Sequence, residues 1–125
     1  MTWSVEDVGP YVLVRTAGTF DVNDHMAMVT DILARLFWRA GRDSLFDHRA
    51  LSFDGAGYSA MTAAAETHRS FDSRIGVGHT ALVMGSLADY GIGRMFDGMV
   101  QGGVQSPMRV FTDIASAEAW LAHPD

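Results

Sequence analysis

The sequence predicts an α/β protein with a single mixed, mostly parallel β-sheet of about five strands, flanked by about four helices. Residues 79–85 are almost entirely apolar, as is typical of a central parallel strand that is covered on both faces. Residues 88–100 have a helical pattern and residues 108–111 a strand pattern, so this helix should cross over between two parallel strands. Residues 3–16 hold two strand patterns around a Gly-Pro pair, which predicts an antiparallel hairpin.

The composition indicates one domain over residues 1–125 and argues against several functions. The net charge of −6, with histidines neutral, argues against broad contact with nucleic acid or with an anionic membrane. The chain has no cysteine, which excludes disulfides, thiolate catalysis and cysteine-based zinc sites. No apolar run approaches the ~20 residues that span a bilayer. No secretion signal is recognisable, so we expect a cytoplasmic protein without integral membrane association.

The first part of the chain should supply the hairpin and a long helix. Residues 3–8 alternate apolar and polar side chains, as an edge strand does, and residues 11–16 form the second strand. We expect the helix to begin at Asp21 or Asn23 and to end at Gly41. The apolar residues at helical spacing between these limits are Met26, Val29, Ile32, Leu33, Leu36, Phe37 and Ala40.

The middle of the chain should supply an inner strand and a second helix. Residues 45–51 are apolar at their start and polar where the strand leaves the sheet, and ligands usually lie at that carboxyl end in open α/β sheets. A loop over residues 52–57 precedes a helix over residues 59–72. The residues of this helix expected to face inward are Ala60, Ala63 and Ala64, with His68 or Phe71.

The crossover helix over residues 88–100 contains three glycines, Gly91, Gly93 and Gly98. Each costs up to ~1 kcal/mol relative to alanine in a helix interior. A packing requirement should offset that cost, because glycine lets the backbone approach a neighbour or a ligand closely. The residues expected to face the sheet are Ile92, Met95, Phe96 and Met99. A strand over residues 108–111 and a last helix over residues 114–121 complete the fold.

Three parts of the chain carry a pattern known from one family. They are residues 44–49 (SLFDHR), residues 90–96 (YGIGRMF), and residues 109–113 (RVFTD) followed by residues 117–121 (AEAWL). Together they resemble the SpoIIAA-like branch of the STAS superfamily, in which an aspartate-ending strand, a YGxxRM helix and an RVF…AxxWL tail recur in this order. The resemblance implies a single mixed sheet flanked by helices. The group includes anti-sigma-factor antagonists and proteins grouped with STAS and CRAL-TRIO lipid-transfer domains.

The resemblance also bears on phosphorylation. The antagonists of this group are phosphorylated on a serine at the start of a helix, within an Asp-Ser-Ser-Gly type of signal after the third strand. The corresponding stretch here is residues 54–57 (DGAG), which has no hydroxyl at either middle position. This departure argues against phosphorylation of the usual serine and leaves Ser59 as a displaced candidate.

Catalytic motifs are sparse. Asp47 and Arg49 share one face of their strand while His48 points to the other, so these three neighbours cannot form a catalytic triad by themselves. We expect Asp47 to cap a loop or to pair with Arg49; the alternative is a polar rim for a ligand. The five histidines show no i, i+4 pair typical of metal ligands, and no Gly-x-Ser-x-Gly elbow occurs. We therefore expect neither a metal nor another cofactor.

Two hypotheses describe a non-enzymatic, STAS-like binding module. In the first, methionines between the sheet and the helices form an adaptable pocket for a small apolar, lipid-like ligand, although filling the core is the alternative role for them. The candidate pocket residues are Asp47, His48, Tyr58, Met84, Arg94 and Phe96. In the second, a protein partner contacts Trp3, Arg35 and Trp38, with the last two exposed on the first helix. Trp3 lies on the outer strand, so this version includes a homodimer.

A third hypothesis belongs to another class, a small enzyme with a cleft at the carboxyl ends of the strands. Its active site would use Asp47, His48, Tyr58 and Arg94. This hypothesis requires the four side chains to converge in one concavity.

Overall fold

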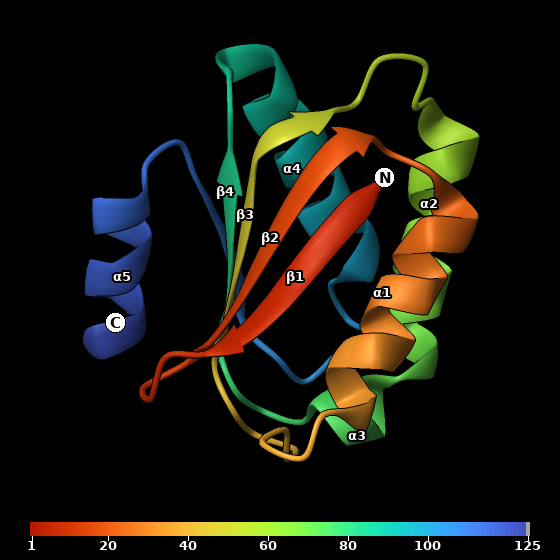
Figure 1. Cartoon of the computed structure of the whole chain (residues 1–125). Coiled ribbons are helices and arrows are strands. Elements are labelled where there is room, and N and C mark those ends of the chain that lie inside the picture. The colour runs from red at the N-terminus through yellow and green to blue at the C-terminus, as the bar shows by residue number, and fades with distance from the viewer. Residues whose placement is uncertain (125) are drawn as a thin grey trace.

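The protein is a five-stranded sheet with helices on both faces, as described by a computed structural model covering residues 1–124. Helices α1, α2 and α4 cover one face, and α5 alone lies against the other (Figure 1). The elements along the chain are β1 (Thr2–Asp7), β2 (Val12–Thr19), α1 (Val22–Ala34), β3 (Ser44–Ser52), α2 (Tyr58–Ser70), α3 (Asp72–Ile75), β4 (Thr80–Met84), α4 (Leu87–Val100), β5 (Met108–Phe111) and α5 (Ile114–Ala122).

The strands lie in the sheet in the same order as in the chain, β1-β2-β3-β4-β5. The β1–β2 pair is antiparallel and the other three pairs are parallel, which confirms the predicted mixed sheet. Because the parallel strands advance in one direction, right-handed crossovers place α1, α2 and α4 on the same face. The opposite face is left for α5.

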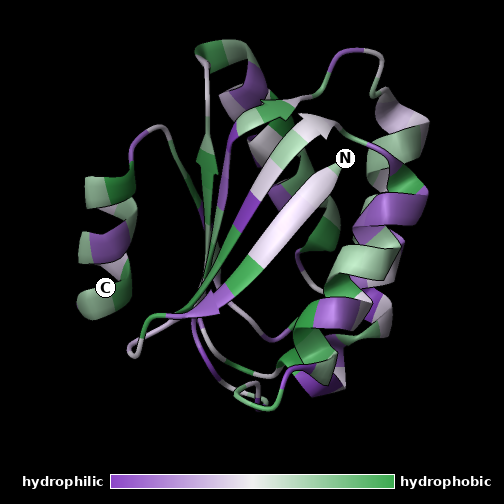
Figure 2. Cartoon of the chain, in the orientation of Figure 1, coloured by the Kyte–Doolittle hydropathy of each residue, from purple (hydrophilic) through white to green (hydrophobic). Residues whose placement is uncertain are grey.

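Strand β4 lies inside the sheet, as its apolar sequence predicts. Leu82 pairs with Phe46 of β3 on one side and with Val110 of β5 on the other. All five residues of β4 are buried. Figure 2 shows the contrast with the outer strand β1, which is mostly pale where β4 is coloured as hydrophobic.

Capping side chains start three of the helices. Asp21 accepts a hydrogen bond from the backbone N–H of Asp24, so Asp21 and not Asn23 is the N-cap of α1. Ser86 caps α4 in the same way, and Asp113 caps α5. These caps position α4 and α5 directly after strands β4 and β5.

Helix α1 ends earlier than its apolar spacing predicts. Its last residue is Ala34, and the C-cap Arg35 already has extended backbone angles. Leu36 is fully exposed and Met26 half-exposed, so neither belongs to the buried stripe. The chain leaves the helix because Trp38 turns back to pack against Val29 and Leu33 of α1 and against Ile75 of α3. Tertiary packing therefore overrides the helical pattern here.

The second helical region is divided in two, so the structure has five helices where about four were expected. Helix α2 ends at Ser70, and the four-residue helix α3 follows it. Ala64 and His68 face inward as predicted, whereas Ala60 and Ala63 are only partly buried. The buried stripe runs through Met61 instead, and so lies one residue further along the chain.

Candidate functional site

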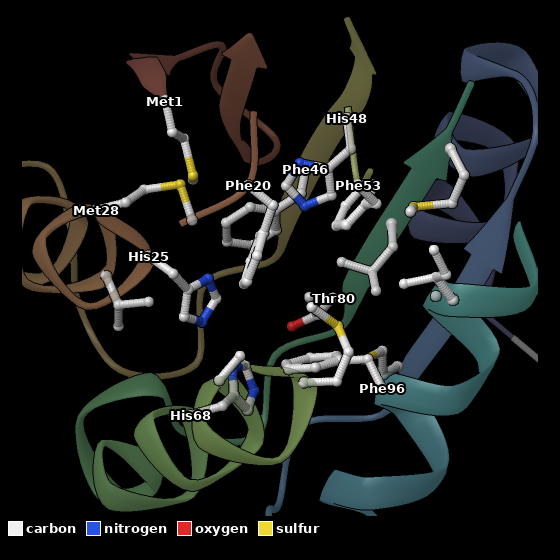
Figure 3. A pocket seen from close by; sticks show the side chains of 18 residues that line it. Met1, Phe20, His25, Met28, Phe46, His48, Phe53, His68, Thr80 and Phe96 are labelled. Atoms are coloured by element: carbon white, nitrogen blue, oxygen red, sulfur yellow. The ribbon is translucent and has the colours of Figure 1, made fainter. Parts of the chain in front are cut away.

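The three-helix face of the sheet encloses a cavity of about 50 Å³ (Figure 3). Apolar side chains dominate its wall, and nine of its eighteen lining residues are methionine or phenylalanine. These nine are Met1, Met28, Met61, Met84, Met108, Phe20, Phe46, Phe53 and Phe96. Three histidines line the same cavity, His25, His48 and His68.

Each histidine is delivered by a different element. His25 lies on α1 one turn before the buried Met28 and Val29. His68 lies on α2 one turn after the buried Ala64 and Ala65. His48 points from β3 toward the helices because side chains alternate along a strand. Figure 3 shows the three rings entering the cavity from these separate positions.

The ring nitrogens of the three histidines are not equally satisfied. His48 Nδ1 lies 2.7 Å from Thr16 Oγ1, within hydrogen-bonding distance. The Nε2 atoms of His25 and His68 are buried and have no hydrogen-bond partner. Both of these rings contact the Phe96 ring, with centroid distances of 6.2 Å for His25 and 5.8 Å for His68. The cavity therefore brings together two Nε2 atoms without a partner, although the His25 ring also has a hydrogen-bonding contact with the backbone of Ala64.

Burial keeps all three imidazoles neutral near pH 7. It lowers the pKa of His25 to about 3, with a smaller contribution from the nearby His48 and His68. Burial likewise lowers the pKa of His48 to about 4 and that of His68 to about 4. A neutral imidazole has one donor and one acceptor nitrogen, so the site offers hydrogen bonds without a fixed charge.

The hydroxyl of Thr80 also reaches the cavity wall, but its bonding capacity is used elsewhere. Thr80 Oγ1 lies 2.8 Å from Ser106 Oγ and 3.5 Å from Ser44 Oγ. Ser106 in turn donates to the carbonyl oxygen of Gly78. This chain of buried hydroxyl groups closes the cavity at the amino ends of β3 and β4, and it contrasts with the unpaired nitrogens of the histidines.

One glycine of α4 explains how closely the helix approaches the sheet. Gly93 is buried, and a Cβ atom added there would lie 2.8 Å from Val110 Cγ1 and 3.3 Å from Met84 Cγ. The packing requirement predicted for the glycines of this helix is therefore met at Gly93. Gly91 and Gly98 have open space at the corresponding position, so nothing in the packing requires them to be glycine.

The predicted pocket residues divide into two groups. His48, Met84 and Phe96 line the cavity, whereas Asp47, Tyr58 and Arg94 do not. Tyr58 is 73% exposed at the start of α2. Arg94 is exposed on α4, where its guanidinium donates to the Tyr90 hydroxyl at 3.3 Å.

Asp47 lies on the α5 side of the sheet and is paired with Arg49, one of the two roles expected for it. The guanidinium donates to the carboxylate through Nε at 2.9 Å and Nη2 at 3.0 Å. These hydrogen bonds lower the pKa of Asp47. The predicted alternation of Asp47 and His48 is therefore confirmed. It also separates the residues of the enzyme hypothesis, because Asp47, His48, Tyr58 and Arg94 do not converge in one concavity.

The predicted interface residues make hydrogen bonds within the chain. Trp3 donates from Nε1 to Asp31 Oδ2 at 2.9 Å, and Arg35 forms an ion pair with the same carboxylate at 3.0 Å. Trp38 donates from Nε1 to the carbonyl oxygen of Arg74 at 3.0 Å. Arg35 and Trp38 follow the last helical residue, so the expectation that they lie on the first helix is wrong. Trp3 does lie on the outermost strand, as predicted.

Comparison with known proteins identifies the fold. No protein-family model matches the chain, and no curated protein sequence matches it. Among solved structures, the crystal structure of an uncharacterized DUF3478-family protein with a SpoIIAA-like fold, from Shewanella loihica PV-4, is similar to it. The TM-score is 0.60, and the match covers 96% of this chain and 92% of that one. The chain has a SpoIIAA-like fold.

The likeness concerns architecture. The two sequences are 15% identical, so the match shows the SpoIIAA-like fold alone. It confirms the fold implied by the resemblance of residues 44–49, 90–96 and 109–121 to the SpoIIAA-like branch. Within this fold, Ser59 is the second residue of α2 and is exposed, which leaves its phosphorylation a prediction.

Two of the three histidines that line the cavity, His25 and His68, were not predicted as site residues from the sequence. The i, i+4 pattern of metal ligands does not reveal these two histidines. A better signal was available, since His25 precedes Met28, Val29 and Ile32 at steps of three, four and seven. A histidine in register with a buried stripe indicates an imidazole that points into the core.

The part of the chain that the structure describes has no recognisable metal site and no membrane-spanning helix. No group of three or more His, Asp or Glu side chains among residues 1–124 is placed to hold a metal ion. Over the same residues, every helix is too short or too polar to cross a membrane.

Proposed function

We propose that this SpoIIAA-like protein is a non-enzymatic binding module that takes a small apolar ligand into the cavity between the sheet and helices α1, α2 and α4. The observation that carries the proposal is the wall of methionine and phenylalanine side chains around a space of about 50 Å³. Apolar walls with a few polar groups are the usual composition of a small-molecule site.

The size of the cavity implies that the ligand enlarges it. Small-molecule pockets usually measure about 300–1,000 Å³, and an engineered cavity of about 150 Å³ binds benzene. A ligand of more than a few heavy atoms therefore enters only if the wall moves. Unbranched methionine side chains such as Met61 and Met84 can change conformation at low cost.

Helix α4 is the wall best suited to move. Gly91 and Gly98 lie in its sequence without a packing reason, and each lowers helix stability by up to about 1 kcal/mol relative to alanine. The elements that open for ligands are usually the less stable parts of a fold. We propose that α4 shifts away from the sheet when the ligand enters.

The absence of reactive groups in the cavity supports binding over catalysis. Among the described residues that line it, none is Asp, Glu, Lys, Arg or Ser, and the Thr80 hydroxyl is already engaged with Ser106. A neutral imidazole can transfer protons, but no carboxylate side chain is among the described lining residues, and the Thr16 hydroxyl beside His48 does not line the cavity. The protein-partner hypothesis has less support because the indole N–H groups of Trp3 and Trp38 are bonded internally. Homodimerisation through β1 stays a prediction that light scattering can test.

A cavity-filling substitution tests the proposal. Ala64 is buried in the cavity wall, so Ala64→Leu should fill the space that the ligand needs. Ala63→Leu is the matched control, because Ala63 is on the same helix and does not line the cavity. Native mass spectrometry of freshly purified protein should show a co-purifying small molecule in the wild type and in Ala63→Leu, and none in Ala64→Leu. Spectra that show only the bare chain for all three proteins would contradict the proposal.

A further inference from the structure

We infer that His25 and His68 receive an uncharged hydroxyl group, so that the ligand of the cavity is a small alcohol or phenol. The inference rests on the proposed function, because it names the chemical class of the ligand for the same cavity. It is carried by the two Nε2 atoms that are buried there without a hydrogen-bond partner.

Unpaired buried nitrogens are unusual in a folded protein. Most buried polar atoms have a hydrogen-bond partner, and a buried polar atom without one lowers the stability of the folded protein. Here two such atoms occur on different helices and line one cavity. Both rings make edge-to-face contacts with Phe96, and Figure 3 shows both pointing into the interior from α1 and α2. A bound group that reaches both nitrogens would satisfy them.

A hydroxyl group matches two neutral imidazoles. It donates one hydrogen bond and accepts others, while each imidazole offers a donor or an acceptor according to its tautomer. One ring can therefore accept from the hydroxyl while the other donates to it. A pure hydrocarbon would leave both nitrogens unpaired.

The ligand head should carry no charge. A carboxylate would need a guanidinium or an ammonium group beside it, and an alkylammonium would need a carboxylate, because isolated charges are costly to bury. No Lys, Arg, Asp or Glu is among the described residues that line the cavity, and the terminal ammonium group of Met1, which also lines it, is already paired with the Asp24 carboxylate at 3.4 Å. The depressed pKa values of His25 and His68 show that this environment also disfavours the imidazolium form.

The remainder of the ligand should be apolar. Phe20 and Phe53 stack with their ring centroids 5.6 Å apart at the cavity wall, and Met28 and Met61 complete it near the two histidines. The polar groups that remain are used within the protein, since His48 lies against Thr16 and Thr80 against Ser106. Specificity for the head group therefore falls to His25 and His68.

Matched five-carbon probes test the inference. Pentanol, pentanoate, pentylammonium and pentane differ only in their head group, and each can be titrated into the whole protein near neutral pH. Pentanol should bind most tightly and should shift the imidazole nitrogen NMR signals of His25 and His68. Pentane should bind more weakly, by about tenfold, as expected when a ligand leaves buried partners unpaired. The two charged probes should bind less well than pentanol.

Substitutions test whether His25 and His68 bind the ligand or only support the fold. His68→Phe and His25→Phe should each remove the preference for pentanol over pentane while pentane still binds. His68→Gln should restore part of the preference, because an amide can donate and accept. His123→Phe is the control, since His123 is exposed after α5, and it should keep the full preference. If either phenylalanine variant fails to fold, the glutamine variant and the other histidine carry the test.

The outcomes distinguish this inference from the proposed function. If pentane and pentanol bind equally and the histidine variants change nothing, the hydroxyl preference is refuted while an apolar site remains. If none of the four probes binds, both conclusions fall. The imidazole nitrogen signals could instead respond only to exchange with solvent water. In that case buried water is the hydrogen-bond partner of these nitrogens, and the inference is refuted.

Discussion

The two faces of the same sheet are built differently. On the α5 face, Leu45, Ala81 and Val83 have no exposed surface and pack against Trp120 and its neighbours on α5. On the opposite face, the alternating residues of the same strands surround a cavity with three histidines. One set of strands thus packs a closed core against α5 on one side and lines a largely apolar cavity on the other, while a separate pocket of about 560 Å³ is lined by the charged side chains of Arg15, Asp47 and Arg49.

The polar groups of the two faces differ in the same way. On the α5 side, Asp47 is held by Arg49, and the Tyr11 hydroxyl donates to Glu118 at 2.7 Å. Burial, together with the hydrogen bond to Glu118, raises the pKa of Tyr11 to about 12. On the three-helix side, two imidazole nitrogens have no partner. The comparison suggests that the α5 face provides stability and that the three-helix face gives up some stability to bind a ligand.

Acidification should give the largest effect, and it should act on the three-helix face. The folded-state pKa values of His25, His48 and His68 lie below the ordinary value of 6.5, so between pH 6.5 and about 4 the unfolded chain binds protons that the folded chain does not. The free energy of unfolding should therefore fall as the pH falls, by up to about 3 kcal/mol for each histidine near pH 4. Urea titrations across this pH window measure the decrease in the free energy of unfolding.

One substitution tests whether the dependence of the free energy of unfolding on pH comes from the cavity histidines. His68→Phe should flatten the dependence on pH, whereas His123→Phe should leave it unchanged. The neighbouring charges are Asp72 and Arg69 beside His68 and Asp47 beside His48. Asp47 has a lowered pKa and titrates below the window. A stability that stays constant from about pH 6.5 to about pH 4.5 would contradict the buried, neutral state of the histidines.

Truncation of Trp120 should give the largest effect of a single substitution. Its ring is buried against Phe111 and His79 in the closed core, so Trp120→Ala should lower the free energy of unfolding by about 3–5 kcal/mol. Denaturant unfolding measures the loss. In the fraction of protein that still folds, pentane binding should be unchanged. A loss of binding in that fraction would mean that the two faces do not have separate roles.

Removal of the Trp38 ring should also destabilise the protein, because the ring packs against Val29, Leu33 and Ile75 and bonds to a backbone carbonyl. Trp38→Ala should cost about 2 kcal/mol. Leu36→Ala is the control, since that side chain is fully exposed, and it should change the stability by less than about 0.5 kcal/mol. A melting temperature unaffected by Trp38→Ala, with weakened self-association, would instead favour a protein interface at this residue.

The glycines of α4 give the smallest and most specific test. Gly93→Ala should destabilise the protein by about 1 kcal/mol, because the new Cβ would press on Val110 of β5 and on Met84, which lines the cavity. Gly98→Ala should stabilise it by about 0.5–1 kcal/mol, because that position is open and alanine favours the helix. Thermal unfolding of the two variants side by side measures the difference. Equal effects at both positions would show that α4 does not approach the sheet as closely as described.

Much of the fold follows from local patterns in the sequence. The apolar stretch at 79–85 predicts the inner strand, and the glycine-containing helix and the next strand follow with bounds within one or two residues of those observed. The end of α1 could not be predicted, because the spacing of Leu36 and Phe37 is compatible with a helix. The contact that ends the helix joins Trp38 to Ile75, which is far away in the sequence.

The candidate site was only partly predictable for a related reason. His48, Met84 and Phe96 could be named because their strand or helix patterns give their direction. The convergence of His25 and His68 depends on how α1 and α2 pack against each other, which no local spacing specifies. Tyr58 and Arg94 were included because of their chemistry, and their elements direct them to solvent.

The central claim is that the three-helix face binds a small apolar molecule in its cavity, and methionine methyl NMR during a pentane titration tests it most directly. The methyl signals of Met61 and Met84, which line the cavity, should shift with saturation, while that of the half-exposed Met26 should not. Signals that stay unchanged up to saturating pentane, or a Met26 signal that shifts as much as those of Met61 and Met84, would contradict the claim.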